Sequence, residues 1–160
     1  MEIERKYLIK TLPDRLKGYP REEISQAYLC TDPVMRIRRK DEDYIFTVKS
    51  GGMMAREEFE FPLPEESYYK LLPKAEGNII EKTRYRIPDK DGLTIELDIF
   101  HGCFEGFIMA EVEFADLNQA ESYMPPSWFG EEVTMDHRFH NSRLSLLDKD
   151  GIRDFLCHLI

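Results

Sequence analysis

The stretch that decides the fold is EIERKYLI, residues 2–9. Three charged residues, Glu2, Glu4 and Lys6, stand at every second position. A β-strand turns successive side chains to opposite faces, so this stretch predicts a strand with its charged side chains in one row. Two carboxylates in such a row repel each other unless something compensates their charge. The next question is therefore which groups face this row.

The same alternation recurs in six further stretches of the chain. Charged or polar residues stand at every second position in the rows Arg36, Arg38 and Lys40; Thr47 and Lys49; Arg56, Glu58 and Glu60; Lys82, Arg84 and Arg86; Glu96 and Asp98; and Glu111 and Glu113. The positions between them are mostly apolar. A single strand of this kind is typical of a sheet with one solvated face. Seven rows built from same-sign neighbours predict instead that the rows face one another.

The turn-forming residues divide the chain into strands near 2–9, 25–30, 34–40, 43–49, 57–62, 79–87, 93–99 and 107–114. Helices are predicted after Pro64, from Asp116 onward, around 141–147 and at 151–160. Eight antiparallel strands can close into a barrel. We therefore predict an α+β protein, mostly β, in which one domain over residues 1–160 forms a closed eight-stranded tunnel. Its lumen is charged, and its apolar core lies outside, under the helices or a second subunit of a homodimer.

Composition limits the possible partners. The 160-residue chain carries a net charge of −9 and has a pI near 5.0, which argues against a nucleic-acid or anionic-membrane binder. Cys30, Cys103 and Cys157 are far apart and show no metal-ligand spacing, so we expect reduced thiols in the cytoplasm. We expect no signal peptide and no membrane span.

The predicted lumen combines two kinds of charge. Its acidic residues are Glu2, Glu4, Glu58, Glu60, Glu96, Asp98, Glu111 and Glu113, and its central cations are Lys6, Arg36, Arg38, Lys49, Lys82 and Arg84. Arginine and lysine in fixed geometry suit phosphate groups. Carboxylates suit a hard divalent ion such as Mg²⁺ or Mn²⁺. Both sets in one tunnel indicate a metal–triphosphate complex.

The ordered motifs resemble those of the CYTH superfamily, the triphosphate tunnel metalloenzymes. The sequence EIERK matches the ExExK motif of that family. The resemblance continues through SQAYL, RIRRK, TVKS, REEFE, EKTRYRI, IELDIF, AEVEF and WFGEEVT…HRFHN, which together span nearly the whole chain. The likeness is greatest to the short bacterial members of the inorganic-triphosphatase type.

The resemblance implies roles for individual residues. It implies metal binding by Glu2, Glu4, Glu111 and Glu113, and phosphate binding by Lys6, Arg36, Arg38, Lys49, Lys82, Arg84 and Arg138. Glu58, Glu60, Glu96 and Asp98 match further acidic positions, and Tyr28 matches an aromatic position near the lumen. We expect Lys6, Lys82, Glu60 and Tyr28 to be the catalytic groups.

The resemblance implies Mg²⁺- or Mn²⁺-dependent hydrolysis of a triphosphate, most simply inorganic triphosphate to diphosphate and phosphate. Positioning and electrostatics carry most of such a reaction. The alternatives within the family are a thiamine triphosphatase and a class IV adenylyl cyclase. An alternative of another class is a non-catalytic polyphosphate or nucleotide binder, although every charged pair is present.

Overall fold

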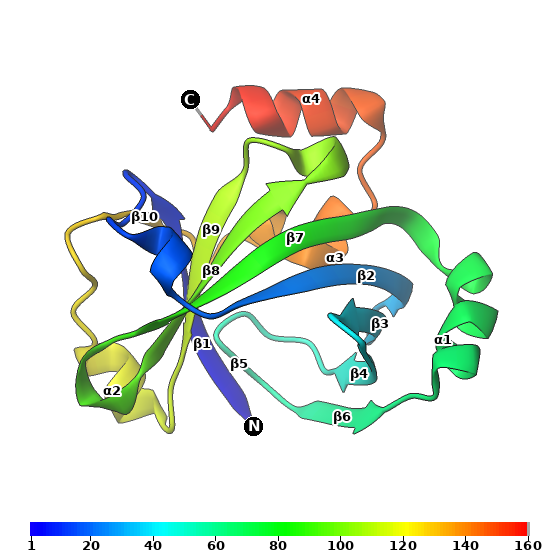
Figure 1. The fold of residues 1–160 in the computed structure, drawn as a ribbon, viewed down its shortest axis with the longest axis horizontal. Coiled ribbons are helices and arrows are strands. Elements are labelled where there is room, and N and C mark those ends of the chain that lie inside the picture. Colours follow the sequence, from blue (N-terminus) through cyan, green and yellow to red (C-terminus); the bar gives the residue numbers. More distant parts are fainter. Residues whose placement is uncertain (160) are drawn as a thin grey trace.

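The computed structural model describes residues 1–159, and its strands form one antiparallel sheet that closes on itself (Figure 1). The strands are β1 (Glu2–Ile9), β2 (Arg21–Thr31), β3 (Val34–Lys40), β4 (Asp43–Lys49), β5 (Ala55–Arg56), β6 (Glu58–Pro62), β7 (Glu76–Pro88), β8 (Thr94–His101), β9 (Ile108–Glu113) and β10 (Phe129–Glu132). Their order in the sheet is β10-β1-β9-β8-β7-β2-β3-β4-β6, and β5 pairs with β1.

The pairing of β5 with β1 closes the ring. Glu2 lies opposite Arg56 and Ile3 opposite Ala55 in this short ladder. Only Glu57 separates β5 from β6, which pairs with β4. Counted as one strand, β5 and β6 give the closed ring eight members, as predicted. The sequence did not predict β10, which pairs with the second half of β1.

The helices are short and lie around the barrel. The α-helices are α1 (Glu65–Leu71), α2 (Leu117–Ser122), α3 (Asn141–Leu144) and α4 (Lys149–Cys157), and the 3₁₀ turns are η1 (Leu16–Gly18), η2 (Leu72–Lys74), η3 (Lys90–Gly92), η4 (Gly102–Phe104) and η5 (His137–Phe139). Asp116 caps α2, since its carboxylate accepts a hydrogen bond from the backbone nitrogen of Gln119. The predicted cap at Asp116 is therefore confirmed. Helix α4 begins at Lys149 because Asp148 caps it, slightly earlier than predicted.

Two apolar clusters lie on the outer faces of the strands, as the alternation predicts. One gathers around Tyr7, Leu97 and Val112 and is covered by α2 through Ala120. The other gathers around Ile37 and Tyr44 and is covered by Tyr68 of α1. Burying apolar faces against these helices stabilises the barrel from outside.

A third cluster corrects the prediction that the whole core lies outside. On the lumen-facing side of several strands, the row of charged or polar side chains ends and the next residue on the same face, two positions along the strand, is apolar. These apolar residues are Leu8, Tyr28, Val34, Ile80, Phe100 and Met109. Phe139 of η5, Leu144 of α3 and Phe155 of α4 pack against them. The rows change from charged to apolar along their length, so one end of the tunnel is filled.

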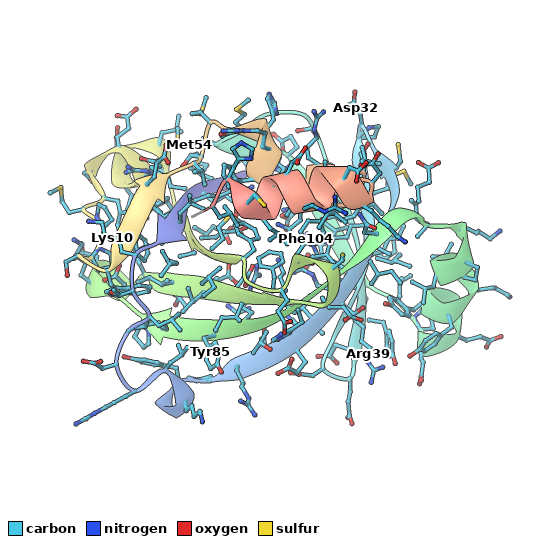
Figure 2. All side chains as sticks on the ribbon, turned by 90° about the horizontal axis from the view of Figure 1, so that it is seen from above. Lys10, Asp32, Arg39, Met54, Tyr85 and Phe104 are labelled. Atoms are coloured by element: carbon cyan, nitrogen blue, oxygen red, sulfur yellow. The ribbon has the colours of Figure 1, made fainter. Side chains whose placement is uncertain are left out.

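Helix α4 crosses the molecule above this cluster, beside Phe104 (Figure 2). Part of the outer wall has no such cover, because Phe59 and Phe61 of β6 are 69% and 52% exposed. The predicted homodimer stays a prediction, and these two side chains are apolar surface that a second copy would cover. None of the helices in residues 1–159 is long and apolar enough to cross a membrane.

Candidate active site

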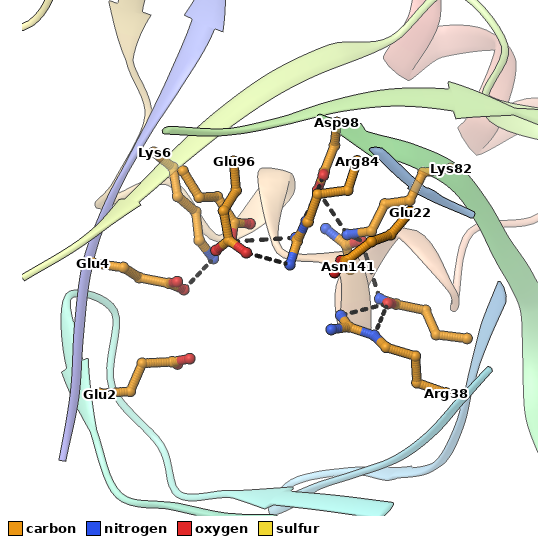
Figure 3. A network of polar contacts seen from close by, with 12 residues as sticks. Glu2, Glu4, Lys6, Glu22, Arg38, Lys82, Arg84, Glu96, Asp98 and Asn141 are labelled. Carbon is orange, nitrogen blue, oxygen red and sulfur yellow. Dashed lines mark hydrogen bonds and ion pairs between the residues drawn. The ribbon is translucent and has the colours of Figure 1, made fainter. Parts of the chain in front are cut away.

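A cavity of about 170 Å³ lies inside the ring (Figure 3). Its charged lining consists of the cations Lys6, Arg36, Arg38, Lys40, Lys49, Arg56, Lys82, Arg84 and Arg86, and of the carboxylates Glu2, Glu4, Glu58, Glu60, Glu96 and Glu111. Within residues 1–159 the lining thus holds nine cations against six carboxylates, although the whole chain carries a charge of −9. This local excess of positive charge favours an anion.

Lys82 and Arg84 share one buried counter-ion at the inner part of the cavity. Lys82 Nζ lies 2.8 Å from Asp98 Oδ2, and the Arg84 guanidinium donates to both oxygens of Asp98 at 2.7 and 2.9 Å. Asp98 has no exposed surface. Burial raises its pKa, but Arg84 and Lys82 outweigh that effect and keep the pKa below its usual value. Asp98 is therefore a structural anion that holds two cations at the cavity wall.

Glu4 and Glu111 lie on neighbouring strands and behave differently. Burial raises the pKa of Glu4 to about 7, and the negative charge of Glu111 adds to the rise. Burial acts in the same direction on Glu111, but Lys6 and Arg84 outweigh it and lower the Glu111 pKa well below its usual value. Near neutral pH the pair therefore contains one firmly ionised carboxylate and one that titrates.

Glu2 lies at the β5 side of the cavity among several partners. Lys49 Nζ donates to its carboxylate at 2.9 Å and lies 3.3 Å from Glu58. Arg56 lies 3.6 Å from Glu2 and 3.9 Å from Glu4. The carboxylates are thus held by protein cations in this structure.

Glu113 differs from the other predicted metal ligands because its side chain is exposed and does not line the cavity. It lies opposite Glu4 in the β1–β9 ladder. Burial raises its pKa to about 7, and the charges of Glu2, Glu96, Glu4 and Glu58 contribute. Glu113 therefore lies at the rim of the cavity, close enough for the negative charges of the lumen carboxylates to raise its pKa.

The structure does not bring Arg138 to the cavity. Its side chain is 73% exposed and pairs with Asp136 at 2.6 Å. Arg138 belongs to η5, whose buried residue Phe139 packs into the apolar end of the barrel. The remaining predicted residues are brought together: Glu60 accepts from Thr47 at 3.1 Å, and Tyr28 accepts from Gln26 at 2.9 Å.

A model of the CYTH domain matches residues 1–149. The chain belongs to the CYTH domain family. It is 41% identical over 149 residues to an inorganic triphosphatase of Nitrosomonas europaea, covering 91% of this chain and 97% of that protein. An inorganic triphosphatase of Acetivibrio thermocellus is 32% identical over 148 residues, covering 89% and 92%.

Solved structures agree with this assignment. A crystal structure of an inorganic triphosphatase matches the CYTH chain with a TM-score of 0.69 and 38% identity over 92% of this chain and 96% of that one. A Hippeastrum protein described as an adenylyl cyclase candidate with a dominant triphosphatase activity matches with a TM-score of 0.58. At 16% identity this second likeness bears on the fold alone.

Several cavity residues of this CYTH protein were missed by sequence reasoning. Gln26 stands two residues before Tyr28 on the same face of β2, so the alternation of the strand could have predicted that Gln26 faces the lumen. Arg56 was placed in a charged row but given no role. Asn141 and Ser142 reach the cavity from α3, outside any strand pattern. No local signal in the sequence points to those two residues.

The predicted metal ligands fit a hard metal ion by their chemistry, because their carboxylates supply only oxygen donors and repel one another. These residues are Glu2, Glu4, Glu111 and Glu113. In residues 1–159 no three His, Cys, Asp or Glu side chains already converge as a metal site. Lys49 and Arg56 hold Glu2 in the present arrangement. Binding an ion would require these carboxylates to turn away from the two cations.

Proposed function

We propose that this CYTH protein hydrolyses inorganic triphosphate to diphosphate and phosphate with the help of Mg²⁺ or Mn²⁺. The observation that carries the proposal is the cavity inside the ring, where nine cations outnumber six carboxylates among the lining side chains of residues 1–159. The relatives named inorganic triphosphatase, one of them 41% identical over nearly its whole length, support the choice of substrate.

The cations of the cavity would hold the chain of phosphates. Arg36, Arg38 and Arg84 offer planar groups that bind phosphate oxygens in pairs, and Lys6, Lys49 and Lys82 offer point charges. Asp98 keeps Lys82 and Arg84 in place before substrate arrives. This preorganisation lets the cations stabilise a growing negative charge without rearrangement.

Glu2, Glu4, Glu111 and Glu113 are the residues that would hold the metal. The bound ion would neutralise charge on phosphate oxygens and favour attack by water. Support for this set comes from its grouping on two paired strands, because Glu4 lies opposite Glu113 and Lys6 opposite Glu111 in the β1–β9 ladder.

The protein's own catalytic groups would be Lys6, Lys82, Glu60 and Tyr28. Glu60 orients a water molecule toward the terminal phosphorus. The bond from that phosphorus to the bridging oxygen breaks, and Lys6 or Lys82 stabilises the charge that the diphosphate oxygen gains. The Tyr28 hydroxyl accepts from Gln26 and can donate its own hydrogen to a phosphate oxygen.

The cavity lining favours a substrate without an organic part. Among the lining residues within the described range 1–159, Tyr28 is the one aromatic side chain and Val34 the one aliphatic side chain. A base or thiazolium ring binds best against apolar and aromatic surface. This observation favours inorganic triphosphate over thiamine triphosphate and ATP.

The test is a substrate panel. Purified protein is given inorganic triphosphate, thiamine triphosphate or ATP, each with Mg²⁺, with Mn²⁺ or with a chelator, and phosphate, diphosphate and cyclic AMP are measured. The proposal predicts fastest turnover of inorganic triphosphate and none with the chelator. Diphosphate and cyclic AMP from ATP would establish a cyclase instead. Tight binding of every substrate without turnover would establish a binding protein.

A further inference from the structure

Two buried amides lie where the charged part of the cavity meets the apolar end. Gln26 of β2 has no exposed surface, and Asn141, the first residue of α3, is 9% exposed. Both contact cations: Arg38 donates to Gln26 and Lys82 donates to Asn141, and Figure 3 labels Arg38, Lys82 and Asn141. An unpaired buried polar group is costly, so the orientation of each amide matters.

The cations fix the orientation of both amides, because arginine and lysine side chains only donate hydrogen bonds. Arg38 donates from Nε and Nη2 to Gln26 Oε1 at 2.9 and 2.6 Å. Gln26 Nε2 must therefore face away from Arg38, and it donates to Asn141 Oδ1 at 3.1 Å. Lys82 Nζ donates to the same oxygen at 2.9 Å.

This arrangement leaves unused donor hydrogens on three cavity residues. Asn141 Nδ2 donates to no acceptor in residues 1–159 and keeps some accessible surface, and Asn141 is a lining residue of the cavity. Tyr28 Oη accepts from Gln26, which leaves the hydroxyl hydrogen free. Lys82 donates to Asn141 and forms an ion pair with Asp98, which still leaves its ammonium group a hydrogen for another acceptor.

We propose that Asn141 contacts the substrate through Nδ2 and that Gln26 is a positioning residue, which turns the free donors of Asn141 and Tyr28 toward the cavity beside Lys82. The inference rests on the proposed function. The acceptors Asn141 Oδ1 and Asp98 are already occupied by protein donors, so Asn141, Tyr28 and Lys82 offer donors at this inner end of the cavity and no free carboxylate or amide oxygen. It therefore takes a phosphate end group, and any organic substituent must face the open side.

Two nearly isosteric variants test the two roles. Asn141→Asp replaces the free donor with a second acceptor and adds a charge that repels phosphate. Gln26→Glu removes the donor that Tyr28 and Asn141 share, so the Tyr28 hydroxyl turns toward the new carboxylate. Matched controls are Asn118→Asp and Gln119→Glu in α2, which make the same chemical changes away from the cavity.

Binding of inorganic triphosphate to metal-free protein is measured by calorimetry, and KM and kcat are measured with Mg²⁺. Loss of hydrogen bonds to charged groups predicts that Asn141→Asp weakens binding and raises KM roughly 10- to 100-fold. Gln26→Glu lowers kcat by more than it raises KM, and both controls match the wild-type protein. Asn141→Ser keeps an acceptor for Lys82 but lacks Nδ2, and it serves if the Asp variant unfolds.

The outcomes separate this inference from the proposed function. If the folded cavity variants bind and turn over triphosphate like the controls, the roles of Asn141 and Gln26 are wrong and the triphosphatase proposal stands. If the wild-type protein itself neither binds nor hydrolyses triphosphate, the proposed function is wrong and the inference falls with it. If Gln26→Glu raises KM and lowers kcat by equal factors and also lowers the melting temperature, Gln26 has only a structural role.

Discussion

Lys82 and Asp98 form a 2.8 Å ion pair in which the two side chains are 1% and 0% exposed. Burial lowers the pKa of Lys82 to about 8, while the charge of Asp98 opposes that change. The pair lies directly beneath the cavity, and Arg84 shares the same carboxylate. Stability and phosphate binding therefore depend on one buried anion.

Removing that anion should destabilise the protein strongly. Asp98→Ala leaves Lys82 buried without its counter-ion and leaves Arg84 with only Glu96 and Glu111 as ion-pair partners. Breaking a buried ion pair on one side typically costs about 3–5 kcal/mol. Urea unfolding would measure the loss. Inorganic triphosphate should restore part of the stability, because its charge replaces that of Asp98. If Asp98→Ala is as stable as the wild-type protein and triphosphate does not change its stability, the pair does not organise the site.

The raised pKa of Glu4 predicts how stability depends on pH without metal. A carboxyl whose folded-state pKa is about 7 holds its proton better than in the unfolded chain, so its contribution is lost as pH rises from its ordinary value of 4.5 through about 7. The contribution of His140 to stability changes with pH in the opposite direction, because burial and the charge of Lys6 lower its pKa to about 3.

Comparison with Glu4→Gln isolates the contribution of Glu4 to the pH dependence of stability. The variant imitates the protonated side chain, so its stability relative to wild type should increase between about pH 5 and pH 8. Thermal unfolding in chelator across that range measures the difference. A difference that is constant or shrinks with pH would contradict the raised pKa.

Glu113→Gln should separate activity from folding. Because Glu113 lies at the rim under repulsion from other carboxylates, the variant should fold normally, or with a small gain in metal-free stability, and lose most of its activity. Triphosphate turnover and melting temperature are measured together, with the exposed Glu105→Gln as control. Marked unfolding would make Glu113 a structural residue, and full activity would remove it from the metal set.

Arg38 and Arg138 were both predicted to bind phosphate, and the structure places only Arg38 at the cavity. Arg38→Ala should raise the KM for triphosphate roughly 10-fold or more, since a charged hydrogen-bonding partner is lost. Arg138→Ala should leave KM and kcat unchanged. The reverse pattern would mean that the η5 segment moves onto the substrate.

Strand alternation made most of this site predictable. The row of Glu2, Glu4 and Lys6 meets other charged rows across the cavity, as its same-sign neighbours indicate. The same face turns apolar at Leu8, two residues beyond Lys6. The periodicity alone does not show that residues of η5, α3 and α4 fill the tunnel at that end.

Residues that reach the cavity from outside the strands were beyond sequence reasoning. Asn141 is positioned by the packing of α3 against the barrel end, which is a tertiary effect. Arg138 is the converse case, because a motif match carries no information on side-chain direction, and its side chain lies outside the cavity in this structure. Its neighbour Phe139 is the one turned inward.

The central claim is metal-dependent hydrolysis of inorganic triphosphate in this cavity, and phosphorus NMR during incubation with Mg²⁺ tests it most directly. The account predicts that the triphosphate signals decay into equal amounts of diphosphate and phosphate. It also predicts that chelator stops the decay and that Glu113→Gln slows it strongly. Unchanged triphosphate signals with active metal present, or equal decay with chelator, would contradict the account.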